Sequence, residues 1–117
     1  MIGTDGDFQL TMDELRAVAR FALECAHPAL VLFTRACPDD GRAAAALEAA
    51  RVFADGAPRS RLQRTAAAAA QRAGQESPSE AARFAAYAAR DASAAAYLHP
   101  LAKATQVRHI LGAPAHA

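Results

Sequence analysis

The chain has 117 residues, a usual length for one domain that leaves no room for a second core of similar size. Its 13 Lys plus Arg nearly balance its 12 Asp plus Glu, which gives a formal net charge of +1. So even a balance argues against a dedicated nucleic-acid-binding protein and against an acidic mimic of nucleic acid. Two cysteines are too few for a small secreted disulfide scaffold, so we expect Cys25 and Cys37 to be unbridged.

Alanine dominates the apolar content, at roughly three in ten residues. Because alanine has the highest helix propensity and is depleted in strands, the sequence predicts an all-α fold. We expect a single-domain, alanine-rich helical bundle of about five to six helices over residues 11–112, between a flexible leader (1–10) and a flexible tail (113–117). No signal peptide is visible and no run approaches the length of a membrane span, so we expect a cytoplasmic protein without a membrane partner.

The first helix is predicted to begin at Thr11. Thr11 and Glu14 have the spacing of a capping box, in which the hydroxyl accepts a hydrogen bond from a free backbone N–H and the carboxylate reaches back to the cap. His27 and Pro28 then interrupt the helical pattern, since proline supplies no N–H and disfavours helix at the residue before it. The run 29–36 is therefore either a kinked continuation or a short second helix.

Turn residues separate the later predicted helices. The third is capped by Asp39 or Asp40 and runs to about Ala54, where Asp55 and Gly56 end it, since glycine suits a left-handed position. The next helix is expected at 58–73, where it would begin at a proline and stop before a glycine. Another is expected at 77–98, beginning with a serine capping box, and the last at 101–111.

One carboxylate occupies a position where the pattern calls for an apolar residue. Asp91 lies on the same face as Tyr87 and Leu98, and burial without a partner would be costly. Arg51 lies on the core-facing stripe of its own predicted helix, with Glu48 farther round. The faces suggest that Arg51 or Arg42 pairs with Asp91, as a tether between helices or as the lining of a binding cleft. The candidate polar residues are Asp39, Asp40, Arg42, Glu48, Arg51, Asp91 and His99.

No metal site or catalytic motif is indicated. The histidines and cysteines lack metal-ligand spacing, and no phosphate loop or nucleophile elbow occurs. The pair Asp39–Asp40 has the chemistry to bind a divalent cation, but a helix cap beside a turn is the favoured interpretation. The arginines at 59, 61, 64 and 72 spread around their predicted helix, which weakens a nucleic-acid interpretation. No cofactor is expected.

Several segments together resemble a known family. These are PDDGR at 38–42 and ALEAAR at 46–51, preceded by Leu-Arg at 15–16, Glu-Cys-Ala at 24–26 and LVLF at 30–33. The chain is similar to the Imm-5-like immunity proteins from Thr11 to about Ala104, most strongly at 38–51. This resemblance implies a small helical bacterial protein of polymorphic-toxin immunity, with no catalytic residues to carry over. Asp91 and Tyr97 stand where the family pattern would have histidines.

Three functions follow as hypotheses. The first is an immunity-like, non-enzymatic binding protein that neutralises a partner toxin by occluding it. The second is a small-ligand binder or an enzyme that uses an interhelical polar cleft around Asp91, Arg51 and Arg42, with His99 nearby. The third is a structural protein that forms a homo-oligomer through the off-stripe residues Phe21 and Val52.

Overall fold

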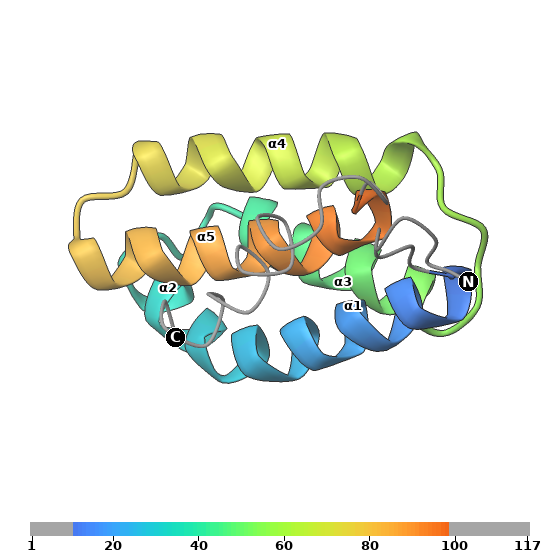
Figure 1. Ribbon diagram of the computed structural model, residues 1–117. Coiled ribbons are helices and arrows are strands. Elements are labelled where there is room, and N and C mark those ends of the chain that lie inside the picture. Colours follow the sequence, from blue (N-terminus) through green and yellow to red (C-terminus); the bar gives the residue numbers. More distant parts are fainter. Residues whose placement is uncertain (1–10, 99–117) are drawn as a thin grey trace, which may run out of the picture.

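The computed structural model describes residues 11–98, and all the regular structure in this range is helical (Figure 1). The α-helices are α1 (Met12–Ala26), α2 (Leu30–Ala36), α3 (Arg42–Ala54), α4 (Arg61–Gln75) and α5 (Glu80–Ala94), with 3-10 turns η2 (His27–Ala29) and η3 (Ala95–Tyr97). The predicted all-α class is confirmed.

The predicted number of helices is too high for the described residues. From Met12 to Ala36 the chain is one continuous helical segment, so α1, η2 and α2 join into one of four such segments between residues 11 and 98. The run 29–36 is thus a kinked continuation: Pro28 cannot donate a backbone hydrogen bond, and the chain passes it as a 3-10 turn. The helix predicted at 101–111 lies outside the described residues.

By length and composition alone, this first segment could cross a membrane. It has 25 residues. An 18-residue window within it has a mean hydropathy of 1.3, and 28% of that window is buried. The expectation that no run approaches the length of a membrane span is therefore wrong. A core helix meets the same criterion, and the buried residues Leu15, Ala19 and Ala22 place α1 against α3 and α5.

Serine caps set the starts of α4 and α5, but at different residues from those predicted. Ser60 and Gln63 form a capping box for α4, which therefore begins three residues after the predicted Pro58. Ser79 caps α5 by accepting from Ala82 N at 3.0 Å, so the expected capping box at Ser77 is wrong. The predicted cap at Thr11 is confirmed, with Glu14 N donating to Thr11 Oγ1 at 3.1 Å and Thr11 N to Glu14 Oε1 at 2.8 Å.

The two glycines that follow the predicted helix ends have different roles. Gly56 has φ of 122°, a left-handed conformation that suits glycine, and it follows α3 as predicted. Gly74 does not stop α4, which continues to Gln75. It is buried, and its missing side chain leaves room for the ring of Tyr87 on α5.

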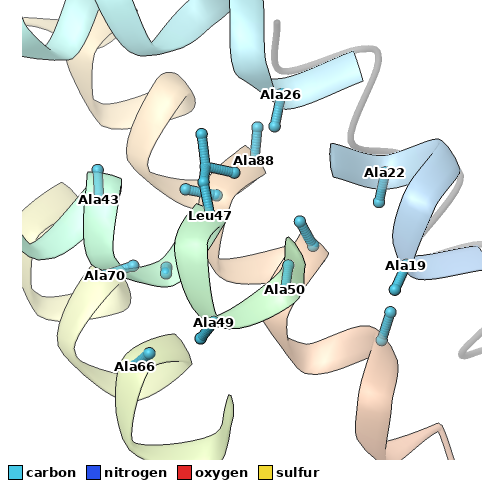
Figure 2. Close-up of a cluster of buried hydrophobic side chains, with 14 of the residues drawn as sticks. Ala19, Ala22, Ala26, Ala43, Leu47, Ala49, Ala50, Ala66, Ala70 and Ala88 are labelled. Atoms are coloured by element: carbon cyan, nitrogen blue, oxygen red, sulfur yellow. The ribbon is translucent and has the colours of Figure 1, made fainter. Parts of the chain in front are cut away.

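The core is built mainly from alanine (Figure 2). Helix α5 contacts each of the other α-helices and is buried on most of its circumference. Because methyl groups are small, the helix backbones approach closely and bury area in this way. The larger buried apolar side chains among the described residues are Leu15, Phe33, Leu47, Phe53 and Leu98.

One buried residue, Gln63, joins three helices. Its side-chain Nε2 on α4 donates to Ala49 O on α3 at 3.0 Å, and its backbone carbonyl accepts from Ser93 Oγ on α5 at 2.9 Å. The side chains of Gln63 and Ser93 are fully buried, and each makes a hydrogen bond that satisfies it. Elsewhere, Cys25 and Cys37 are free thiols, as predicted.

Candidate functional site

A groove of about 430 Å³ lies between α3 and the part of the first helical segment that runs from Leu23 to Leu30. Buried or half-buried Leu23, Leu30 and Leu47 give it an apolar floor, while exposed Glu24 and Arg51 lie at its rim. The full lining is Leu23, Glu24, His27, Pro28, Leu30, Ala44, Leu47, Glu48 and Arg51. An apolar concavity with a few polar groups at its edge is the usual form of a binding site.

Local sequence explains why this space stays open. Pro28 bends the first helical segment where it passes the groove, so His27 and Pro28 line one side. On the other side, exposed Ala44 contributes only a methyl group. The interruption at His27 and Pro28 was predicted from the sequence, with a kinked continuation as one of two alternatives. The groove was not predicted, because it depends on how α1 crosses α3.

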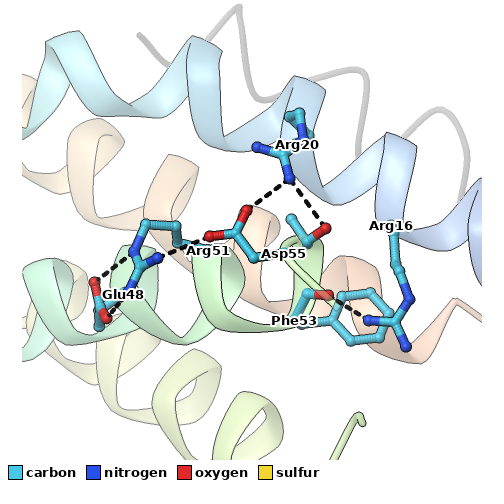
Figure 3. Close-up of polar contacts among 7 residues, drawn as sticks. Arg16, Arg20, Glu48, Arg51, Phe53 and Asp55 are labelled. Carbon is cyan, nitrogen blue, oxygen red and sulfur yellow. Dashed lines mark hydrogen bonds and ion pairs between the residues drawn. The ribbon is translucent and has the colours of Figure 1, made fainter. Parts of the chain in front are cut away.

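Alternating charges connect the rim of the groove to the seam between α1 and α3 (Figure 3). Arg51 donates to Glu48 through Nε at 3.0 Å and to Asp55 at 2.8 Å, and Arg20 on α1 donates to Asp55 at 2.7 Å. Hydrogen bonds from Arg51 and Arg20 lower the pKa of Glu48 and of Asp55, respectively. The side chains are about half exposed, so the pairs contribute little stability, but they orient Arg51 and Glu48. The prediction that Arg51 faces the core is wrong.

Two arginines of α1 contact the C-terminal end of α3. Arg16 donates to Phe53 O and, at 2.8 Å, to Ala57 O, and its guanidinium lies 4.6 Å from the centroid of the Phe53 ring. Arg20 also donates to Ala54 O at 3.0 Å. The last carbonyl groups of a helix lack intrahelical donors, so these contacts satisfy the end of α3 and fix α1 against it.

The predicted pairing of Asp91 with Arg42 or Arg51 is wrong. Arg42 makes two hydrogen bonds to Asp40, at 2.9 and 2.7 Å, and a third to Glu76 at 2.7 Å. Asp40 also accepts from Arg42 N at 3.0 Å, which agrees with the interpretation of this residue as part of a helix start. Arg42 lowers the pKa of Asp40 through the side-chain hydrogen bonds, and these carboxylates raise the pKa of Arg42.

Asp91 is fully buried, as its place in the pattern predicted. Its Oδ1 accepts from Arg90 Nε at 2.9 Å, so its arginine partner in the described residues is its chain neighbour. Arg90 also donates to Gln71 on α4 and lies 4.5 Å from the centroid of the Tyr87 ring. The carboxylate is therefore connected to α4 through Arg90.

The predicted polar residues do not form one site. Glu48 and Arg51 line the groove, whereas Arg42 and Asp91 do not, so the cleft expected around Asp91, Arg51 and Arg42 is not formed. Asp39 is exposed, and His99 lies outside the described residues. Among residues 11–98, no group of three His, Cys, Asp or Glu side chains is placed to hold a metal ion.

Fold and site together define a small helical bundle with an apolar groove at the kink of its first helical segment. A family model described as "Imm-5 like putative immunity protein" matches residues 9–112. The chain therefore belongs to the Imm-5-like family. Comparisons with curated proteins and with solved structures gave no significant match.

Proposed function

We propose that this chain is a cytoplasmic immunity protein that binds a partner toxin and neutralises it by occlusion, without a catalytic step of its own. The observation that carries the proposal is the groove between α1 and α3, which would receive a segment of the toxin. Membership in the Imm-5-like family supports the immunity role.

The form of the groove suits a protein partner. Protein interfaces bury an apolar centre, often anchored by one large side chain in a pocket, within a polar rim. Here Leu23, Leu30 and Leu47 provide the apolar surface, and the charges of Glu24 and Arg51 lie at its edge. A volume of about 430 Å³ accommodates such an anchor.

The electrostatics of the rim favour binding over catalysis. A general acid needs a pKa raised towards neutral pH. The pKa of Glu48 is lowered instead, because Arg51 donates hydrogen bonds to its carboxylate. Glu48 therefore remains ionised and is suited to pairing with a cation of the partner.

A growth experiment tests the proposal. A candidate toxin, sought among the genes adjacent to the gene for this chain, would be expressed in a bacterial host with or without this chain. We expect growth to be restored by the wild-type chain and lost with Ala44→Trp, whose indole would fill the groove. Ala45→Trp is the matched control, because Ala45 is exposed on the same helix but does not line the groove.

The two variants separate the possible outcomes. Circular dichroism and thermal melts must show that both fold like the wild type. Rescue by wild type and Ala45→Trp, but not by Ala44→Trp, supports toxin binding in the groove. Equal rescue by both variants would remove the groove from the proposal, and no rescue by the wild type would contradict neutralisation of that toxin.

A further inference from the structure

A second hollow lies at the beginning of α4, beside η3, and shares no residue with the groove. Its volume is about 350 Å³, and it is lined by Arg59, Ser60, Arg61, Arg64 and Tyr97. All three arginines are exposed. These arginines spread around their predicted helix, but the fold brings them together because Arg59 precedes α4 and Tyr97 of η3 lies beside the start of that helix.

An aromatic ring and a backbone carbonyl hold two of these arginines in place. The Arg64 and Arg59 guanidinium groups lie 4.5 and 5.9 Å from the centroid of the Tyr97 ring. Arg59 also donates to Ala96 O at 3.0 Å. Within the part of the chain that the structure describes, none of the ion pairs involves Arg59, Arg61 or Arg64. Their positive charge is therefore not neutralised there.

The surrounding sequence supplies no counter-charge. Arg59, Arg61, Arg64 and Arg72 fall between Asp55 and Glu76 with no Asp or Glu among them, and no Asp or Glu follows Asp91 in the chain. Since the formal net charge is only +1, this segment concentrates positive charge in a nearly neutral chain. Such a local field favours a negatively charged partner.

We propose that this basic hollow binds an acidic segment of a protein partner, which, on the basis of the proposed function, is the toxin. Each guanidinium presents a planar set of donors that matches a carboxylate, and several close together suit a run of Asp or Glu. The exposed position of the arginines suits an extended surface segment. Charges at the edge of an interface mainly accelerate association, so the hollow would steer the partner towards the bundle.

Two observations argue against nucleic acid or a phosphate cradle. Single-stranded nucleic acid is usually bound by stacking bases on aromatic rings, but two guanidinium groups already engage the Tyr97 ring. Phosphate binding at a helix start uses free backbone N–H groups, but the Ser60 hydroxyl accepts from Leu62 N at 3.2 Å. The arginine side chains are therefore the main binding groups of the hollow.

The test measures binding of a fluorescent hexaglutamate peptide to the full chain by anisotropy at low ionic strength. We expect Arg61→Gln combined with Arg64→Gln to weaken binding about tenfold, and raising the salt from about 0.01 M to about 0.15 M to weaken it further. The matched control combines Arg72→Gln with Arg83→Gln, which removes the same charge from exposed arginines that do not line the hollow. Tyr97→Leu provides a second variant that leaves the charge unchanged and should also weaken binding.

Weaker peptide binding by Arg61→Gln/Arg64→Gln, with a change of less than about twofold in Arg72→Gln/Arg83→Gln, supports peptide binding in the hollow. Equal weakening in both would show a response to net charge alone and would overturn the proposal. Displacement of the peptide by inorganic diphosphate at a lower concentration than by unlabelled peptide would assign the hollow to a phosphate ligand and would also overturn it.

A second measurement addresses the partner. Association of the toxin identified by growth rescue should slow with Arg61→Gln/Arg64→Gln and not with Arg72→Gln/Arg83→Gln. Unchanged association would overturn the toxin as the partner of the hollow. Because the peptide measurement needs no toxin, failure of the rescue experiment and failure of the hollow are separate results.

Discussion

The ring of Tyr87 on α5 packs directly on the backbone of Gly74 on α4. A Cβ atom at position 74 would lie 2.5 Å from Tyr87 Cε1, well inside van der Waals contact. This contact explains a glycine in the last turn of α4 whose φ is not left-handed. It lets the two helices approach each other closely.

Gly74→Ala should therefore destabilise the protein. Alanine gains up to about 1 kcal/mol over glycine in a helix, but overpacking costs about 1–3 kcal/mol. We expect the clash with Tyr87 to dominate and the free energy of unfolding in urea to fall by about 1 kcal/mol.

The same substitution in a Tyr87→Ala background tests whether the clash with the ring causes the destabilisation. With Tyr87→Ala already present, Gly74→Ala should become neutral or stabilising, since the ring that it would strike is absent. Gly41→Ala serves as a control, because a Cβ there would meet nothing within 4 Å. Destabilisation by Gly74→Ala that persists in the Tyr87→Ala background would contradict the explanation.

Replacement of Asp91 tests its buried contact with Arg90. Asp91→Ala removes the acceptor 2.9 Å from Arg90 Nε and leaves a cation that is only 19% exposed, so we expect the free energy of unfolding to fall by about 3 kcal/mol. Adding Arg90→Ala should recover part of that loss, because the stranded charge is then gone. The measurement is chemical denaturation of both single variants and the double variant. A free energy of unfolding close to that of the wild type for Asp91→Ala would show that the carboxylate has no structural role.

The Asp40–Arg42 pair predicts a pH dependence. Arg42 lowers the pKa of Asp40 below its ordinary value of 3.8 in the folded protein. A carboxyl group with a depressed folded pKa stabilises the fold above its unfolded pKa, and this contribution is lost as the pH falls from near 3.8 through the folded pKa. Asp40→Asn should lower the melting temperature at pH 7 and have progressively less effect in acid.

Melting temperatures of wild type and Asp40→Asn, measured across this acidic range, check the expectation. Asp39→Asn is the matched control, because Asp39 is the exposed neighbour and makes none of the hydrogen bonds described for Asp40. A constant difference between wild type and Asp40→Asn at all pH values would show that the ionised carboxylate is not what stabilises the fold.

Local chemistry allowed several features to be predicted from the sequence. The all-helical class follows from the abundance of alanine, and the start of α1 follows from a cap formed between Thr11 and Glu14. The kink depends only on the missing N–H of Pro28, and the burial of Asp91 depends only on helical period. Each of these depends on residues within one or two turns of chain, so no knowledge of neighbouring helices was needed.

The predicted pairing of Asp91 failed because each arginine has an acceptor close to it in the sequence: Arg51 pairs with Glu48 and Asp55, Arg42 with Asp40, and Arg90 with Asp91. Tertiary structure decided the contacts between distant segments, such as Arg42 with Glu76 and Arg20 with Asp55. The groove exists because α1 crosses α3 at a particular position. The basic hollow exists because Tyr97 of η3 lies beside the start of α4, with its ring centroid 4.5 Å from the Arg64 guanidinium. Helix crossing and rotation arise from the packing of many small side chains together, which no local segment of the sequence encodes.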